Sequence, residues 1–303
     1  MTLSDFALRH SPENNDPAPV SVLAPYSNII LTLSLCTLFI VKHAILEPHL
    51  PHIYAHVWGP SSDATKRALL TLHLAALIRI IIVVVGLYPF LSLVFGSSRL
   101  SDPVGIFGER LKMGDCIVIV MNLLPSFYIF EIIHRSRLSI VTWMHHVGSI
   151  LTAQGTVTLV NYGHVNVRYQ FLLIAVWGCF DIIMEIAPIF ALLRLRLARG
   201  NHDHLCFVFK VTARWLFILN NIQSVLVIYI IWMIWDEWAL VFKIVSPLLY
   251  VAFTGAQWQQ AYLYVKLMRK ELDEKFRKIA LKEVEGHPLS PEEEKEKEKE
   301  NEK

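Results

Sequence analysis

Long runs of apolar residues are the feature that most constrains how this chain can fold. A helix of about 20 mostly apolar residues crosses the hydrocarbon core of a bilayer. Seven stretches of the 303-residue sequence meet this criterion: 28–46, 68–95, 114–133, 138–160, 169–193, 217–235 and 240–266. Only 18% of the residues are charged, against about a quarter in a typical soluble domain. The sequence therefore predicts an all-α, polytopic membrane helical bundle with about seven transmembrane helices.

The composition also excludes several other classes of protein. The net charge is +2, and no basic patch interleaved with aromatic residues is present, so we expect no nucleic-acid partner. The four cysteines are scattered, without metal-ligand or disulfide spacing, and we predict neither a metal nor another bound cofactor. The first 25 residues lack a basic region followed by an apolar core, so we expect no cleavable signal peptide.

The distribution of Lys and Arg predicts how the chain is oriented, because cytosolic loops are richer in these residues. The richer side holds Lys66, Arg67, Arg135, Arg137, Arg194, Arg196, Arg199, Lys210, Arg269 and Lys270. The other side holds Arg9, Arg99, Arg110, Lys112, Arg168 and Lys243. We therefore predict a luminal N-terminal segment (1–27), a first membrane helix with its loop (28–65), a membrane domain (66–270), and a charged, largely disordered cytosolic tail (271–303).

Two adjacent histidines, His145 and His146, lie inside the fourth predicted span. Ionisable groups in membrane helices usually face the interior of the bundle or a water-filled cavity. Ser149 and Thr152 follow His145 at offsets of four and seven, so they share its face of a helix. His146 lies about 100° further round. One histidine can thus face an interior cavity while the other packs against a neighbouring helix, and the divergence disfavours a shared metal ion.

Two carboxylates, Asp181 and Glu185, lie four residues apart in the fifth predicted span and so stack on one helix face. A cationic or proton-donating partner would offset the cost of placing them in hydrocarbon. His145 or His146 is the natural candidate, because spans joined by a short loop pack antiparallel. We therefore predict a polar-lined interior cavity.

Further polar residues lie in the other spans, among them Arg79, Asp115, Asn122 and Glu131. Asn and Gln in membrane helices commonly form hydrogen bonds to a neighbouring helix. Asp115 and Glu131 lie near the predicted ends of the third span, where carboxylates can reach the lipid headgroups. We predict structural roles for most of these side chains, while Arg79 fits either a structural role or a place in the cavity.

The segment FYIFEIIHRSRLSIVTWMHHVGSILTAQ contains an aromatic-rich helix with an acidic residue near its end, a short basic loop, and a helix bearing His-His. With the spacing of the histidines from Tyr128 and Glu131, this order resembles the TLC family. That family's membrane domain is shared by ceramide synthases and translocating-chain-associated membrane proteins. The resemblance covers roughly residues 66–270 and implies a helical bundle of the endoplasmic reticulum that takes part in lipid homeostasis.

The synthase branch of this family continues with a His-Asp-x-x-Asp block in the next span. In the matching segment, VWGCFDIIME, Trp177 and Gly178 stand where His and Asp are expected, and Asp181 takes the place of the last Asp. In that branch the histidine pair is implicated in acyl transfer from acyl-coenzyme A to a sphingoid amine. Half of the acidic block is missing here, so a non-synthase member of the family is the better match.

Three functions stay open at this point. The first is a protein that binds, senses or moves a membrane lipid (a sphingolipid, a fatty acyl chain or a phospholipid) in a cavity lined by His145, His146, Ser149, Thr152, Asp181 and Glu185. The second is an N-acyltransferase that uses acyl-coenzyme A as co-substrate and a sphingoid base as acceptor, with His145, His146 and Asp181 as catalytic residues. The third is a structural component beside a translocation channel. Self-association into a homo-oligomer also stays open.

Overall fold

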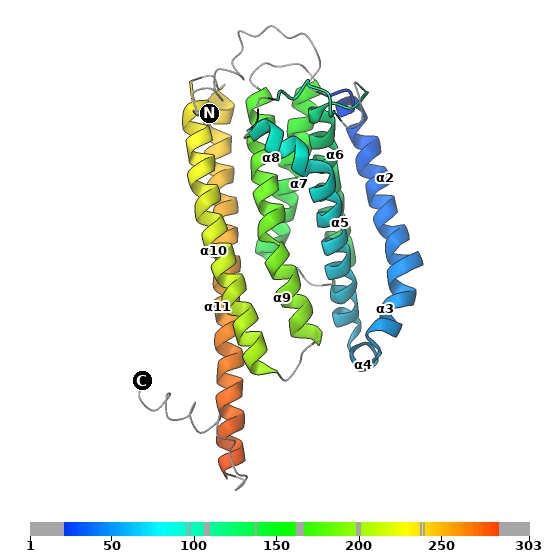
Figure 1. Cartoon of the computed structure of the whole chain (residues 1–303), viewed down its shortest axis with the longest axis vertical. Helices are drawn as coiled ribbons and strands as arrows, with labels where there is room; N and C mark the ends of the chain where they lie inside the picture. The colour runs from blue at the N-terminus through cyan, green and yellow to red at the C-terminus, as the bar shows by residue number, and fades with distance from the viewer. Residues whose placement is uncertain are drawn as a thin grey trace.

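The computed structural model describes residues 21–94, 96, 98–105, 110–136, 138–161, 167–197, 201–236, 238 and 240–284. Every extended regular element among these residues is a helix, which confirms the predicted all-α fold. In chain order the elements are η1 (Ala24–Tyr26), α2 (Ser27–Ile40), the π-helix η2 (Val41–Leu46), α3 (Glu47–Ile53), α4 (Ala55–Trp58), α5 (Asp63–Val94), α6 (Met113–His134), α7 (Ile140–Asn161), α8 (Val167–Met184), α9 (Ile186–Leu197), α10 (His202–Met233) and α11 (Leu240–Val284). The helices run alongside one another in a bundle (Figure 1).

Six helical stretches among the described residues are long and apolar enough to cross a bilayer. They are Ala24–Ile53, Asp63–Leu93, Met113–His134, Leu173–Leu197, His202–Met233 and Leu240–Leu281. These stretches support the prediction of an integral, multi-pass membrane protein, in which α6 packs against α2, α5, α7 and α8.

Helix α7 is the predicted span that is absent from this set of six. It forms a helix of 22 residues, about 33 Å long at 1.5 Å per residue, but its two histidines and several Ser and Thr side chains lower its mean hydropathy. Figure 1 shows α6 and α8 running in the same direction, so α7 must return between them. It packs against α6, α8 and α11, and these contacts bury His146 and Thr156 while Thr158 is exposed.

The buried and exposed side chains are distributed as expected for a protein in a membrane. Large apolar residues face outward, including Val84 of α5, Val225 of α10 and Val251 of α11, which are 77%, 73% and 67% exposed. Several polar side chains are instead buried, among them Arg79 and Gln223. Because hydrocarbon offers polar groups no hydrogen bonds, they are favoured inside the bundle.

The α10–α11 hairpin extends beyond the apolar stretches that predicted it. Helix α10 begins at His202, fifteen residues before the predicted span, and α11 continues to Val284. Polar contacts join the two extensions: His202 Nδ1 lies 2.8 Å from a Glu271 oxygen, and Lys275 Nζ donates to Asp203 at 2.6 Å. The predicted boundary at residue 270 therefore falls inside a helix, while the tail from 285 to 303 lies outside the described residues.

The fifth predicted span is interrupted at Glu185, which is one of the predicted site residues. Helix α8 ends at Met184 and α9 begins at Ile186, with Glu185 in the turn between them. Pro188 lies one turn further on, and a proline has no N–H to donate to the carbonyl four residues before it. The backbone bonds from Glu185 to Asp181 and from Ile189 to Glu185 persist, so the helix axis continues across the break.

The basic residues that predicted the orientation sort to opposite ends of the bundle. The start of α5, the end of α6, the end of α9 and the start of α10 lie toward one end, and they carry most of the described residues of the richer set (Figure 1). Arg99, Arg110, Lys112 and Lys243 precede α6 or begin α11 at the other end. Arg9, Arg137 and Arg199, and the side chain of Arg168, lie outside the described residues.

Asp115 fastens the start of the described chain to the bundle. It is fully buried, and its Oδ1 accepts hydrogen bonds from Ser21 Oγ (2.6 Å), the Val22 amide (2.7 Å) and the Leu23 amide (3.0 Å). Its Oδ2 accepts from the Lys112 amide at 2.8 Å and so caps α6. The carboxylate therefore does not reach toward the headgroups, contrary to the expectation from its position near a helix end.

We expect Asp115→Ala to lower the free energy of unfolding by about 3 kcal/mol, because several buried donors would lose a charged acceptor. Thermal or denaturant unfolding of the purified protein in detergent measures this change. Asp102→Ala is the matched control, since Asp102 accepts one exposed hydrogen bond from the Arg99 amide. Equal stability of the two variants would contradict an anchoring role for Asp115.

Candidate functional site

The two adjacent histidines of α7 make contacts with different helices. His146 is buried, with 6% of its surface exposed, and its Nε2 lies 3.0 Å from Glu131 Oε2 of α6. His145 lies toward α8, with its Nε2 3.9 Å from Asp181 Oδ1. The structure therefore places two histidine–carboxylate pairs side by side, in place of one cluster built on Asp181 and Glu185.

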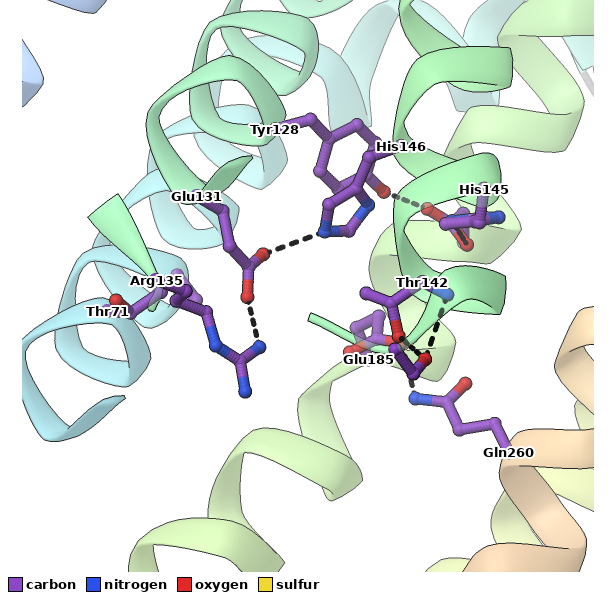
Figure 2. Close-up of polar contacts among 12 residues, drawn as sticks. Thr71, Tyr128, Glu131, Arg135, Thr142, His145, His146, Glu185 and Gln260 are labelled. Carbon is purple, nitrogen blue, oxygen red and sulfur yellow. Dashed lines mark hydrogen bonds and ion pairs between the residues drawn. The ribbon is translucent and has the colours of Figure 1, made fainter. Parts of the chain in front are cut away.

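The pair of His146 and Glu131 is a closed, hydrogen-bonded contact. Glu131 also forms an ion pair with Arg135, one turn along the chain, so its carboxylate is bound from two sides (Figure 2). The His146 ring stacks on the Tyr128 ring, with 4.3 Å between centroids and 13° between planes. Tyr128 and Glu131 lie three residues apart on one face of α6, and Arg135 follows directly after the end of this helix.

The pair of His145 and Asp181 is more open. At 3.9 Å, the distance between Nε2 and Oδ1 exceeds the range of a hydrogen bond. Asp181 Oδ2 instead accepts a hydrogen bond of 2.6 Å from the Tyr128 hydroxyl. His145 Nδ1 is buried and has no partner among the described residues, while its ring makes edge contacts with Tyr128 and Phe253. His145 is therefore available for another contact.

Glu185 forms a third polar contact, one turn beyond Asp181. Its Oε1 accepts a hydrogen bond of 2.6 Å from Gln260 of α11 (Figure 2). Its Oε2 lies 3.7 Å from Nη2 of Arg79 on α5. Arg79 is 5% exposed, and its Nη1 donates to the Ala75 carbonyl at 3.2 Å. These residues tie α5, the α8–α9 junction and α11 together, and the sequence did not predict that Gln260 or Arg79 would meet Glu185.

Two cavities adjoin at these residues. The first, here called the apolar cavity, has a volume of about 270 Å³ and is lined mainly by apolar side chains of α5, α6, α7, α8 and α11. Ser149 and Thr152 are among the few polar residues on its wall. The Thr152 hydroxyl donates to the Gly148 carbonyl at 2.7 Å, so the helix backbone satisfies this polar group and leaves the wall hydrophobic.

The second, here called the polar cavity, has a volume of about 610 Å³. Its charged lining residues are Arg79, Glu131, Arg135, Asp181, Glu185, Arg196 and Lys266. It surrounds the last turns of α6 and the turn between α8 and α9, and so lies toward the end of the bundle that is rich in Lys and Arg. Both histidines line it.

The boundary between the cavities is formed by four residues that line both: Tyr128, His145, Asp181 and Gln257. Gln257 of α11 is buried, and its Oε1 has no partner among the described residues. His145 Nδ1 and Gln257 Oε1 thus provide hydrogen-bonding capacity where a hydrophobic chamber meets a charged one. An amphiphilic molecule has the same division between an apolar chain and a polar head.

The segment that lacks half of the expected acidic block forms part of the apolar cavity. Trp177 is buried and packs edge-on against Phe253, with 5.1 Å between ring centroids. Gly178 also lines the cavity, and a Cβ atom placed there would meet no other atom within 4 Å. Where the resemblance implies a polar pair, the chain therefore has an aromatic wall and open space.

The sequence identified the histidines and Asp181 as members of one site. The structure brings His145 and Asp181 to the boundary of the two cavities, while His146 lines only the polar cavity. The sequence did not identify Glu131 as the partner of His146. The three-residue spacing of Tyr128 and Glu131 on α6 was the available signal, because it places both on the face toward α7. Gln257 was identifiable as a polar residue within the seventh predicted span, but the sequence did not place it or Phe253 at this site, since their contribution depends on how a distant helix packs.

Searches against protein-family models, curated proteins and solved structures found no match to this chain.

Proposed function

We propose that this chain is a multi-pass membrane protein that binds a lipid between its helices. The lipid's hydrocarbon chain would occupy the apolar cavity, and its headgroup would occupy the polar cavity. The observation that carries this proposal is the adjoining of the two cavities at Tyr128, His145, Asp181 and Gln257. A purely structural component has no need of unpartnered polar atoms facing such a junction, so the translocation-associated alternative is disfavoured.

The size of the apolar cavity favours a lipid with one chain inside the protein. Its 270 Å³ lies just below the range for small-molecule pockets, about 300–1,000 Å³. The lining is almost entirely hydrophobic and so matches a hydrocarbon chain, which meets an apolar environment in the cavity as it does in the bilayer. A second chain would remain in the surrounding bilayer.

The resemblance to the TLC family and the placement in the endoplasmic reticulum belong to the same proposal. The Lys- and Arg-rich end of the bundle would face the cytosol, with the N-terminal segment in the lumen, in accord with the bias expected of cytosolic loops. In this orientation the polar cavity lies toward the cytosolic side. A lipid headgroup would then reach the leaflet facing the cytosol.

Gly178→Leu tests the proposal, because Gly178 lines the apolar cavity and a Cβ atom there would meet no protein atom within 4 Å. We expect at least a tenfold loss of co-purifying lipid, measured by mass spectrometry of protein extracted from membranes into nanodiscs. Gly155→Leu is the matched control: Gly155 is exposed on α7, its Cβ position is also open, and it lines neither cavity. Equal lipid content in both variants, with both folded, would refute binding in this cavity.

An acyl-coenzyme A-dependent N-acyltransferase is the second candidate, favoured by the position of His145 at the cavity boundary beside Asp181. In this reaction an amine nitrogen attacks the thioester carbonyl, the C–N bond forms, the C–S bond breaks, and the thiolate leaves. His145 could accept the proton lost by the amine and return it to the thiolate, as histidine does near neutral pH. Incubation with acyl-coenzyme A and a sphingoid base, with product detected by mass spectrometry, distinguishes this activity from binding alone.

A further inference from the structure

Two pairs of ionisable side chains on the wall of the polar cavity are held apart. Arg79 Nη2 lies 3.7 Å from Glu185 Oε2, and His145 Nε2 lies 3.9 Å from Asp181 Oδ1. Hydrogen bonds between opposite charges are normally 2.7–2.9 Å long. In a membrane interior, where opposite charges attract strongly, such pairs are expected to close. The contact between His146 and Glu131, at 3.0 Å on the same cavity wall, shows a pair that has done so.

Each of the two carboxylates is anchored by a neutral donor through one oxygen only. Tyr128 donates to Asp181 Oδ2, and Gln260 donates to Glu185 Oε1, both at 2.6 Å. The other oxygen of each carboxylate accepts no hydrogen bond within the described part of the chain. On the cationic side, Arg79 Nε is buried and also has no partner there. The cavity wall therefore presents two carboxylate oxygens without a hydrogen-bond donor in the described part of the chain, and beside them the guanidinium of Arg79.

The balance of charge excludes a headgroup of one sign. Arg79, Arg135, Arg196 and Lys266 line the cavity together with Glu131, Asp181 and Glu185. A purely anionic group placed beside Arg79 would also approach Glu185, and a purely cationic group beside Glu185 would approach Arg79. A headgroup with both charges can satisfy each side, because its anion meets the guanidinium while its ammonium meets the carboxylates.

We propose that the polar cavity recognises a zwitterionic headgroup that carries a phosphate and a primary ammonium on a single-chain amphiphile. The inference rests on the proposed function and names its ligand class. The phosphate pairs with Arg79, whose planar guanidinium suits phosphate oxygens. The ammonium donates to Asp181 and Glu185. Two kinds of lipid share this chemistry: a lysophospholipid with an ethanolamine headgroup, and a phosphorylated sphingoid base.

A panel of five single-chain lipids with matched chain length tests the proposal on the wild-type protein in nanodiscs. Lysophosphatidylethanolamine and sphingosine 1-phosphate carry both charges, lysophosphatidic acid carries only the phosphate, sphingosine carries only the ammonium, and monoacylglycerol carries neither. We expect one or both of the zwitterionic lipids to bind at least tenfold more tightly than the other three. The stronger of the two identifies the source of the headgroup, glycerol-based or sphingoid.

Two variants then test which side chain binds the phosphate and which binds the ammonium of the headgroup. Arg79→Gln should reduce binding of the zwitterionic lipids at least tenfold and leave sphingosine binding unchanged. Glu185→Gln should also reduce binding of the zwitterionic lipids at least tenfold, and it should leave lysophosphatidic acid binding unchanged. Lys243→Gln is the control, because Lys243 lies near the start of α11 and lines neither cavity. Thermal unfolding of each variant establishes that it is folded.

The outcomes separate this inference from the proposed function. Equal binding of all five lipids, or tightest binding of lysophosphatidic acid or sphingosine, overturns the zwitterionic headgroup and leaves lipid binding in the apolar cavity intact. Absence of binding by every lipid, with no lipid lost on Gly178→Leu, overturns both.

Discussion

Replacement of His146 by alanine is expected to lower the free energy of unfolding by about 3 kcal/mol, because removal of one partner of a buried hydrogen-bonded pair leaves the Glu131 carboxylate poorly compensated. Glu131 would keep only Arg135, and Tyr128 would lose the ring that stacks on it at 4.3 Å. Denaturant unfolding in bicelles, followed by tryptophan fluorescence, measures the change.

His49→Ala provides the control for this measurement. His49 is exposed on α3, and its Nδ1 contacts only the Ile45 carbonyl of the preceding turn. We expect its effect on unfolding to lie within about 0.5 kcal/mol, as for most surface substitutions. If His146→Ala were as stable as this control, the closed pair with Glu131 would have no structural role.

His145→Gln, unlike His146→Ala, is expected to leave the free energy of unfolding nearly unchanged and to reduce the amount of bound lipid. No hydrogen bond of the His145 ring would be lost, since its distance to Asp181 is 3.9 Å and its Nδ1 has no partner among the described residues. Glutamine also retains much of the bulk that contacts Phe253. We therefore expect the free energy of unfolding to change by less than about 1 kcal/mol, while lipid retained through purification falls at least tenfold.

The same variant decides between the two candidate functions. If the protein transfers acyl groups, loss of a general base should reduce the rate by about 10²–10⁴-fold, as measured by product formation from acyl-coenzyme A and a sphingoid base. Product formation that is undiminished in His145→Gln would remove His145 from the chemistry. Retained lipid together with normal folding would show that His145 lies at the cavity boundary without contributing to binding.

The contrast between the two histidines shows how far sequence reasoning reaches. Helical geometry separates neighbouring side chains by about 100°, and this predicted that one histidine would face a cavity and the other a neighbouring helix. It could not predict which carboxylate each would meet. Glu131 lay near a predicted helix end, where a headgroup contact was the simpler interpretation, and only the packing of α6 against α7 brought it to His146.

Asp181 and Glu185 illustrate a second limit. Their spacing of four placed them on one helix face, and the backbone bonds across the α8–α9 break preserve that relation. Their partners, however, come from four different helices: Tyr128 from α6, His145 from α7, Arg79 from α5 and Gln260 from α11. Contacts between residues more than 30 positions apart leave no periodic signal in a single sequence.

Consecutive residues were enough to predict that this chain forms apolar helices of bilayer length and that most of its polar side chains lie inside the bundle. Both predictions follow from local properties, since helix length and hydropathy are read from neighbouring residues. The packing of α7 against α6, α8 and α11, the separate pairs of the two histidines, and the meeting of an apolar and a polar cavity at His145 became visible in the folded protein alone. These features depend on which faces of distant helices pack together, and that choice is made by the whole bundle.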